Sequence, residues 1–422
     1  MNTFSSLLRR RPHFRRLWIA QIISLLGDWL SFVAVSLLAL KQGDGIVALA
    51  LVLVAHTLPR ALLAPVAGAL ADRLDRRRMM IGANVAQGLL TLGMAAAAAA
   101  GSVWLVQLLV FARAGVSAFL EPVESAVMRH VVNDDELLTA NAVHSVTWSV
   151  MFSVGMALGG LLAALGPAPA LLIDAITFGL AALTLRKLPA MAAAGRAAAP
   201  LAAIAAVPRD MVAAFRYAWA RPALFDAVLS KTPPALAGGG AWVLLNLVAD
   251  DAAFIGSGAL TLGLLQCVRG VGTGVGPMLS AWMIRRRVSE QTAGQIAQWT
   301  AHGGIALFAL SGHWAPLTFA ALAWGAGVGS NWVLSSATIQ RLSPDAFIGR
   351  LSALDWLIFT VGMCAAALGG AALVEHTGSR PASAWLGLAL GVSAWAALQW
   401  VLRRRTGGVD ERAATAEPEL PG

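Results

Sequence analysis

Charged side chains are scarce in this chain. Asp, Glu, Lys and Arg make up 13% of its 422 residues, whereas about 25% is usual for a soluble globular domain. Hydrophobic residues make up 58% of the chain, and its mean hydropathy is +0.70. This composition argues against an ordinary soluble domain and indicates a protein that lies within a lipid bilayer.

Cysteine is also scarce, and several catalytic motifs are missing. The two cysteines, Cys267 and Cys364, lie far apart in predicted helices and suggest neither a disulfide framework nor a metal site. The phosphate-binding GxxxxGK[ST], the hydrolase GxSxG and the zinc-binding HExxH motifs do not occur. We therefore expect no enzyme, no cofactor, no bound metal and no ATP-driven pump.

Apolar runs long enough to cross a bilayer as a helix recur along the chain. We identify about twelve of them, at 17–40, 46–70, 79–100, 103–127, 140–165, 168–186, 222–248, 256–284, 292–311, 315–340, 349–374 and 381–402. The first run is long enough to span and lacks a small-residue cleavage site, so we expect no cleaved signal peptide. The expected fold is an all-α membrane protein with twelve transmembrane helices.

The positive charges lie mainly on one side of the predicted membrane. The net charge is +9, and of the Lys and Arg outside the apolar runs only Lys41 and Arg380 fall on the opposite side. Because cytoplasmic loops carry the excess of Lys and Arg, both termini are expected in the cytoplasm. This asymmetry accounts for the basic composition without a nucleic-acid partner and favours the cell (inner) membrane.

A charged block separates the second and third runs, where residues 68–78 read GALADRLDRRR. Such a block cannot lie in hydrocarbon, so it must form a loop at a membrane face. It resembles the signature loop of the major facilitator superfamily, which is matched by Gly68, Asp72, Arg73, Arg76 and Arg77. Asp75 stands where that family usually has Gly, so we expect a turn there that is not left-handed.

The two halves of the chain share a pattern with a period of about 210 residues, as parallel internal repeats do. Arg60 and Arg269 each lie 16 residues before an Arg triplet, and SAVMRH and SATIQR each precede a glycine pair. The period spans six helices, so both halves have the same orientation, as in this superfamily. We expect a six-helix half at 1–186, a cytoplasmic linker with an amphipathic helix at 187–221, a second half at 222–402 and a disordered tail at 403–422.

Further segments resemble one branch of the superfamily. LLGDWL, LLIDAITF and FRYAWARPAL are similar to the twelve-helix branch that contains macrolide and siderophore exporters. The resemblance implies alternating access, with the substrate site between the halves. It also implies that the signature loop is a gate, with Asp72 near the start of the eleventh helix at 343–350.

Ionisable side chains within the runs are candidates for substrate binding and coupling. Each costs about 2.5–3.5 kcal/mol at a helix centre, so each needs a partner or a polar cavity. We place Asp28, Arg60, Arg113, Lys231 and Arg269 near the membrane centre, Asp174 in the outer third of its helix and Asp355 in the inner third. The alternative for each is a structural ion pair, or a side chain that snorkels to the interface from a misplaced span. Asp28 is the favoured proton carrier, with His56, His144 or Glu121 as alternatives, and Arg60 and Arg269 are a candidate pair for an anionic group.

Glycines at helical spacing form a last candidate set. Those on the fifth helix resemble the glycine motif of antiporters without its proline, although close helix packing explains glycines equally well. The set comprises Gly155, Gly159, Gly160, Gly369 and Gly370.

Taken together, the sequence favours a proton-coupled exporter of small amphiphilic molecules that works as a monomer. An importer or exchanger of small organic anions is the second interpretation, because cations outnumber acids near the predicted membrane centre. A membrane sensor or assembly factor that transports nothing is an alternative of another class.

Overall fold

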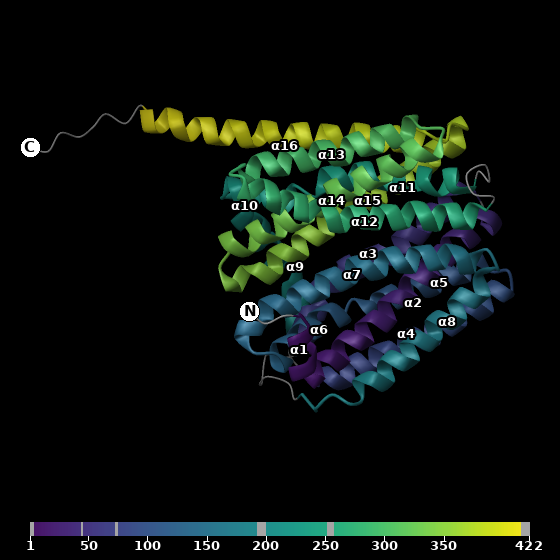
Figure 1. Ribbon diagram of the computed structural model, residues 1–422. Coiled ribbons are helices and arrows are strands. Elements are labelled where there is room, and N and C mark those ends of the chain that lie inside the picture. Colours follow the sequence, from purple (N-terminus) through teal and green to yellow (C-terminus); the bar gives the residue numbers. More distant parts are fainter. Residues whose placement is uncertain (1–3, 44, 72–74, 192–199, 251–256, 415–422) are drawn as a thin grey trace, which may run out of the picture.

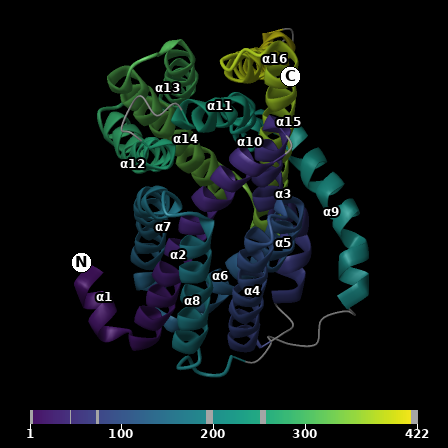
Figure 2. The same cartoon turned by 90° about the vertical axis from the view of Figure 1, so that its right-hand side faces the viewer.

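The computed structural model describes residues 4–43, 45–71, 75–191, 200–250 and 257–414, and every regular element in these ranges is a helix. The helices form two bundles that lie side by side (Figure 1). One bundle comes from the first half of the chain and the other from the second half. The view along the bundles separates them clearly, with the first half below the second (Figure 2).

The first bundle contains helices α2 to α8, preceded by the short helix α1 (Phe4–Arg10). Helix α7 packs against α2 and α8, and α4 packs against α5 and α8. The bounds are α2 Pro12–Gln42, α3 Ile46–Ala71, α4 Arg76–Ala99, α5 Val103–Ser117, α6 Leu120–Val131, α7 Asp134–Ala163 and α8 Pro167–Leu185.

The second bundle contains helices α10 to α16. Helix α14 packs against α12 and α13, while α11 packs against α15 and α16. The bounds are α10 Pro222–Leu229, α11 Thr232–Asp250, α12 Gly258–Arg285, α13 Glu290–Leu310, α14 Trp314–Leu342, α15 Asp345–Thr377 and α16 Ala382–Ala414.

Each predicted run corresponds to one helix or to two consecutive helices. Within the described residues, nine segments are long and apolar enough to cross a membrane by length and composition alone. Helices α11, α12 and α13 are not among these nine. They nevertheless pack within the second bundle, α12 and α13 against α14, and α11 against α15 and α16.

Two predicted runs are interrupted in the structure. The run at 103–127 divides at Ala118–Phe119 into α5 and α6, and the run at 222–248 divides at Ser230–Lys231 into α10 and α11. The second interruption has a sequence signal, since prolines are favoured in the first turn of a helix and Pro233–Pro234 follow Thr232.

The two bundles touch at the end where α3 begins and α15 ends, which we call the far end. The backbone N–H of Val47 donates to Glu375 Oε1 at 2.8 Å. On the other flank of the molecule α7 meets α12 closely, because a Cβ atom on Gly160 would lie 2.8 Å from Gly263 Cα. The halves are therefore joined at the far end by both α3–α15 and α7–α12.

Helix α9 (Pro200–Trp219) connects the bundles at the opposite end, which we call the terminal end. The sequence predicted an amphipathic helix within 187–221, and Pro208 lies inside the observed helix. Its buried side packs on α10 and α15 through Ala214 and Ala218. Val212, Phe215 and Trp219 lie on its exposed side, so the predicted apolar face is divided between protein and surroundings.

The C-terminal segment differs from the sequence prediction over part of its length. A disordered tail was expected from residue 403, but α16 continues as a helix to Ala414. Residues 415–422 lie outside the described part of the chain.

Candidate transport site

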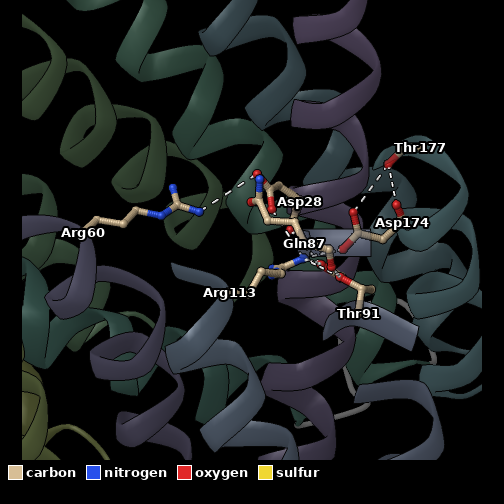
Figure 3. Close-up of polar contacts among 8 residues, drawn as sticks. Asp28, Arg60, Gln87, Thr91, Arg113, Asp174 and Thr177 are labelled. Atoms are coloured by element: carbon tan, nitrogen blue, oxygen red, sulfur yellow. Dashed lines mark hydrogen bonds and ion pairs between the residues drawn. The ribbon is translucent and has the colours of Figure 1, made fainter. Parts of the chain in front are cut away.

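Arg113 of α5 is the centre of a buried ionic cluster in the first bundle (Figure 3). Its Nη1 atom lies 2.5 Å from Asp174 Oδ2 of α8 and 3.4 Å from Asp28 Oδ1 of α2. The side chains of Arg113 and Asp174 are 2% and 0% exposed. One guanidinium therefore serves two carboxylates, and the pair with Asp174 is the tighter and more deeply buried of the two.

Arg60 of α3 approaches the same cluster from the opposite side (Figure 3). Its Nη2 atom lies 4.0 Å from Asp28 Oδ2, and its side chain is 26% exposed. Asp28 thus lies between two arginines, with a close contact to neither. The cluster contains two carboxylates and two guanidiniums, so its formal charge is zero when all four groups are ionised.

The structure brings Asp174 and Asp28 together. We expected Asp174 in the outer third of its helix and Asp28 as the acid near the membrane centre, and both contact the same nitrogen of Arg113. The sequence did not predict that the two carboxylates share one cation.

Several uncharged polar groups complete this cluster, and the sequence reading missed them. Ser31 Oγ and Thr91 Oγ1 accept hydrogen bonds from Arg113 Nη1 at 3.3 and 3.4 Å. Gln87, one turn from Thr91, is fully buried, and neither its amide N nor its amide O has a hydrogen-bond partner among the described residues. Ser31 and Thr177 lie three residues after Asp28 and Asp174, a helical spacing that provides a usable signal.

Arg269 of α12 lies at the junction of the halves and is held differently from Arg60. Its Nε donates to Gln266 Oε1 at 2.9 Å. Its guanidinium carbon lies 5.0 Å from the ring centres of both Phe152, in the first bundle, and Trp324, in the second. Among the described residues it makes no ion pair, so the symmetric sequence positions of Arg60 and Arg269 have different surroundings.

Lys231 and Asp355 form a second buried ion pair, this time within the second bundle. Lys231 Nζ lies 2.5 Å from Asp355 Oδ2 and donates to Ser336 Oγ at 3.2 Å. The ammonium also lies 4.2 Å from the ring centre of Trp332. The sequence selected both ionic residues but did not predict that they pair.

The interruption between α10 and α11 lies next to this pair and is held by side chains. A broken helix leaves carbonyl groups without helical partners. Ser230 O accepts from Gln298 Nε2 at 2.6 Å and from Asn331 Nδ2 at 2.9 Å, and Ala227 O accepts from Ser335 Oγ at 2.8 Å. Side chains of α13 and α14 therefore supply the hydrogen bonds that the backbone carbonyls at the interruption would otherwise lack.

The signature loop is partly described. Asp72 and Arg73 lie outside the described residues, and Gly68 falls near the end of α3. Asp75 has φ −61°, which confirms the predicted absence of a left-handed turn. Its side chain caps α4 by accepting a hydrogen bond from Arg78 N.

The arginines of the loop contact the first bundle. The buried Arg76 contacts His130, and Arg77 Nη2 donates to Arg186 O at 2.5 Å. Helix α15 begins at Asp345, within the predicted region.

The selected glycines lie where helices approach one another. A Cβ atom on Gly155 would lie 2.6 Å from Trp29 Cβ, and one on Gly159 would lie 3.0 Å from Leu30 O. The Cβ of a residue replacing Gly370 would lie 3.0 Å from Ser383 Cβ, whereas Gly369 has more room. Close packing thus accounts for Gly155, Gly159 and Gly370 without a further role.

Nearly the whole chain matches one family of membrane proteins. The family described as "Transmembrane secretion effector" (MFS_3) matches residues 2–420 of this chain. The chain belongs to this family. It is therefore a member of the major facilitator superfamily of transporters and not an enzyme, and it spans the membrane several times.

Individual relatives match part of the chain. The uncharacterized MFS-type transporter YfiS of Bacillus subtilis is 29% identical over 185 residues, which are 43% of this chain and 44% of that protein. Macrolide efflux protein A of Streptococcus pyogenes is 27% identical over 151 residues, 35% of this chain and 37% of that protein. The matches therefore span less than half of these relatives.

Solved structures show the same fold over nearly the whole chain. A bacterial homologue of the iron transporter ferroportin, in its inward-facing state, has a TM-score of 0.71 at 15% identity and covers 93% of this chain and 98% of that one. The nucleoside transporter NupG (D323A mutant) has a TM-score of 0.71 at 14% identity, covering 92% and 98%. These likenesses establish the major facilitator fold.

Proposed function

We propose that this transporter is a proton-coupled exporter of small amphiphilic molecules that works by alternating access. The observation that carries the proposal is the arrangement of two carboxylates around Arg113, with Asp28 also facing Arg60. A buried carboxylate between movable cations binds a proton when those cations withdraw and releases it when they return. Coupling then follows if α3, which packs on α15 of the other half, shifts relative to α2 and carries Arg60 away from Asp28 when the halves move.

Asp28 suits the role of proton carrier better than Asp174. The Asp28 side chain is 11% exposed and its nearest cationic nitrogens lie at 3.4 and 4.0 Å, whereas Asp174 is fully buried at 2.5 Å from Arg113. A proton reaches Asp28 without disrupting the tightest ion pair of the cluster. In this proposal Asp174 and Arg113 are the fixed partners and Asp28 is the exchangeable group.

Aromatic residues between the halves support an amphiphilic substrate. Trp29 of α2 lies 4.7 Å, ring centre to ring centre, from Phe152 of α7, which stacks on Trp148. Phe32 of α2 lies 6.0 Å from Trp242 of α11 in the other half. Flat apolar groups bind well to such surfaces. The direction of transport rests on the similarity to a macrolide efflux protein over about a third of the chain.

Arg269 favours a second candidate, the transport of small organic anions. A guanidinium with no acidic partner among the described residues, placed between aromatic rings of the two halves, suits a carboxylate or phosphate of a substrate. Arg60 is less available for such a group because Asp28 lies beside it. An anion site at the centre would thus depend on Arg269 more than on the symmetric pair.

Orientation and gating complete the proposal. With both termini in the cytoplasm of a cell whose inner membrane holds the protein, the contact of the halves at the far end corresponds to a closed outer side. The loop with Asp72 then acts as the cytoplasmic gate opposite the start of α15. The transporter works as a monomer, since each chain contains both halves of the site.

Transport into proteoliposomes with an imposed pH gradient tests the proposal. A panel of fluorescent amphiphiles and small organic anions identifies a transported compound. For that compound, Asp28→Asn should abolish accumulation driven by the gradient while binding and exchange remain, because a neutral amide cannot carry the proton.

Asp355→Asn is the matched control, since it neutralises a buried aspartate of the other half that takes no part in the proposed coupling. It should retain gradient-driven transport in the fraction that folds. Wild-type accumulation by Asp28→Asn would show that Asp28 is structural. Transport of anions alone, lost with Arg269→Gln, would favour the second candidate.

A further inference from the structure

An open groove of about 690 Å³ lies beside α9 at the terminal end of the molecule. Its floor is apolar and aromatic, because Tyr217 of α9 stacks on Phe347 of α15 with ring centres 4.3 Å apart. Val212 lies on the same side and is 51% exposed. The groove is lined by Pro208, Arg209, Val212, Ala213, Arg216, Tyr217 and Phe347.

The rim of this groove is cationic. Arg209 and Arg216 both line it, and neither forms an ion pair within the described part of the chain. They are seven residues apart, so about two helical turns separate them on one face of α9. The neighbouring acid, Asp210, is already used, since its Oδ2 lies 3.4 Å from Arg350 Nη2. The groove therefore has an excess of positive charge over an apolar floor.

The position of α9 shows which kind of ligand this combination suits. The helix crosses the terminal ends of α3 and α15 on the outer flank of the bundles (Figure 2). Phe215 and Trp219 of this helix contact Phe225 of α10 and remain 41% and 46% exposed. Exposed aromatic side chains beside arginines are typical of a helix that lies in the membrane interface. A ligand with an anionic head and apolar chains meets both surfaces there.

We propose that this groove binds an anionic phospholipid, with its phosphate between Arg209 and Arg216 and its acyl chains along Val212 and Phe347. The site is independent of the transported substrate. Because the groove is lined by α9 and by Phe347 of α15, a lipid bound there lies between the linker and the second half.

Native mass spectrometry of the full-length protein, titrated with phosphatidylglycerol or phosphatidylcholine, tests the site. Wild-type protein should retain phosphatidylglycerol preferentially. Arg209→Gln/Arg216→Gln should weaken its binding about ten- to thirtyfold, because each arginine near an anionic headgroup contributes about a factor of five. Val212→Glu, which places a carboxylate in the groove without removing an arginine, should weaken binding independently.

Arg285→Gln/Arg286→Gln is the matched control, because it removes two exposed arginines near the end of α12, outside the groove. It should leave the affinity for phosphatidylglycerol unchanged. An equal loss in this control would show that diffuse surface charge attracts the lipid, and would overturn the proposal. Unchanged binding in both groove variants, or displacement of the lipid by millimolar inorganic phosphate, would also overturn it.

Discussion

Thr57 Oγ1 of α3 and Cys364 Sγ of α15 lie 3.4 Å apart, although the two residues belong to different halves of the transporter. The substitution Thr57→Cys therefore places a second sulfur beside a native one across the junction. We expect a disulfide to form on mild oxidation, since both side chains already point at each other. Alternating access requires the halves to separate, so oxidation should stop transport and reduction should restore it.

Thr57→Ser is the control for this experiment, because it keeps a hydroxyl and cannot form the bridge. Cross-linking is read from a mobility shift after proteolytic cleavage between the halves. Full transport by an oxidised, fully cross-linked Thr57→Cys protein would contradict movement between α3 and α15.

The cluster around Arg113 predicts a difference between two substitutions of that residue. Arg113→Met leaves Asp28 and Asp174 buried without this cation, which should cost about 3–5 kcal/mol of unfolding free energy. Arg113→Lys should cost much less, because both carboxylates and both hydroxyls contact the same nitrogen, Nη1. Unfolding in mixed micelles measures both; equal losses would mean that the planar guanidinium matters and not only its charge.

The Lys231–Asp355 pair predicts that a second substitution restores stability lost through the first. Lys231→Met alone leaves a buried carboxylate without its cation and should destabilise the protein by about 3–5 kcal/mol. Lys231→Met/Asp355→Leu removes both charges, so the double variant should be more stable than the single one. Thermal unfolding of the three proteins provides the comparison. A double variant less stable than Lys231→Met would show that Asp355 has other partners.

Gln87 predicts a substitution that stabilises the protein. In the part of the chain that the structure describes, both polar atoms of its amide are buried without partners, and burying such an amide costs about 1–3 kcal/mol. Gln87→Leu should therefore raise the unfolding temperature. Gln107→Leu is the contrasting control. Gln107 Nε2 donates to Ala48 O at 2.6 Å, so loss of this hydrogen bond should lower the unfolding temperature. A destabilised Gln87→Leu would indicate that the amide is satisfied in the membrane.

The sequence predicted the fold well because its main signals are local. Long apolar runs, the charged loop and the repeat depend only on residue type and spacing, and each run corresponds to one or two helices. The ionic residues were also visible, because charge is rare in such runs. Asp28, Arg113 and Asp174 all stand out in the sequence for this reason.

The sequence did not predict which of these residues meet. Arg60 and Arg269 occupy equivalent positions in the repeat, yet one faces Asp28 and the other faces two aromatic rings. Partners come from other helices, whose rotation and axial shift depend on packing across the whole bundle. The interruption at Ser230 had a local signal in Pro233–Pro234, but its hydrogen bonds to Gln298 and Asn331 depend on helices about 70 and 100 residues away in the sequence.

The amides that hold the Ser230 carbonyl determine how the second half can bend. Gln298 and Asn331 attach the end of α10 to α13 and α14, so α10 cannot swing freely about the interruption. Any pivoting of the seventh transmembrane segment must instead occur in α11, with α10 moving as part of the α13–α14 body. Helix α9 packs directly on α10, so a displacement of the linker is transmitted to that body rather than absorbed at the break.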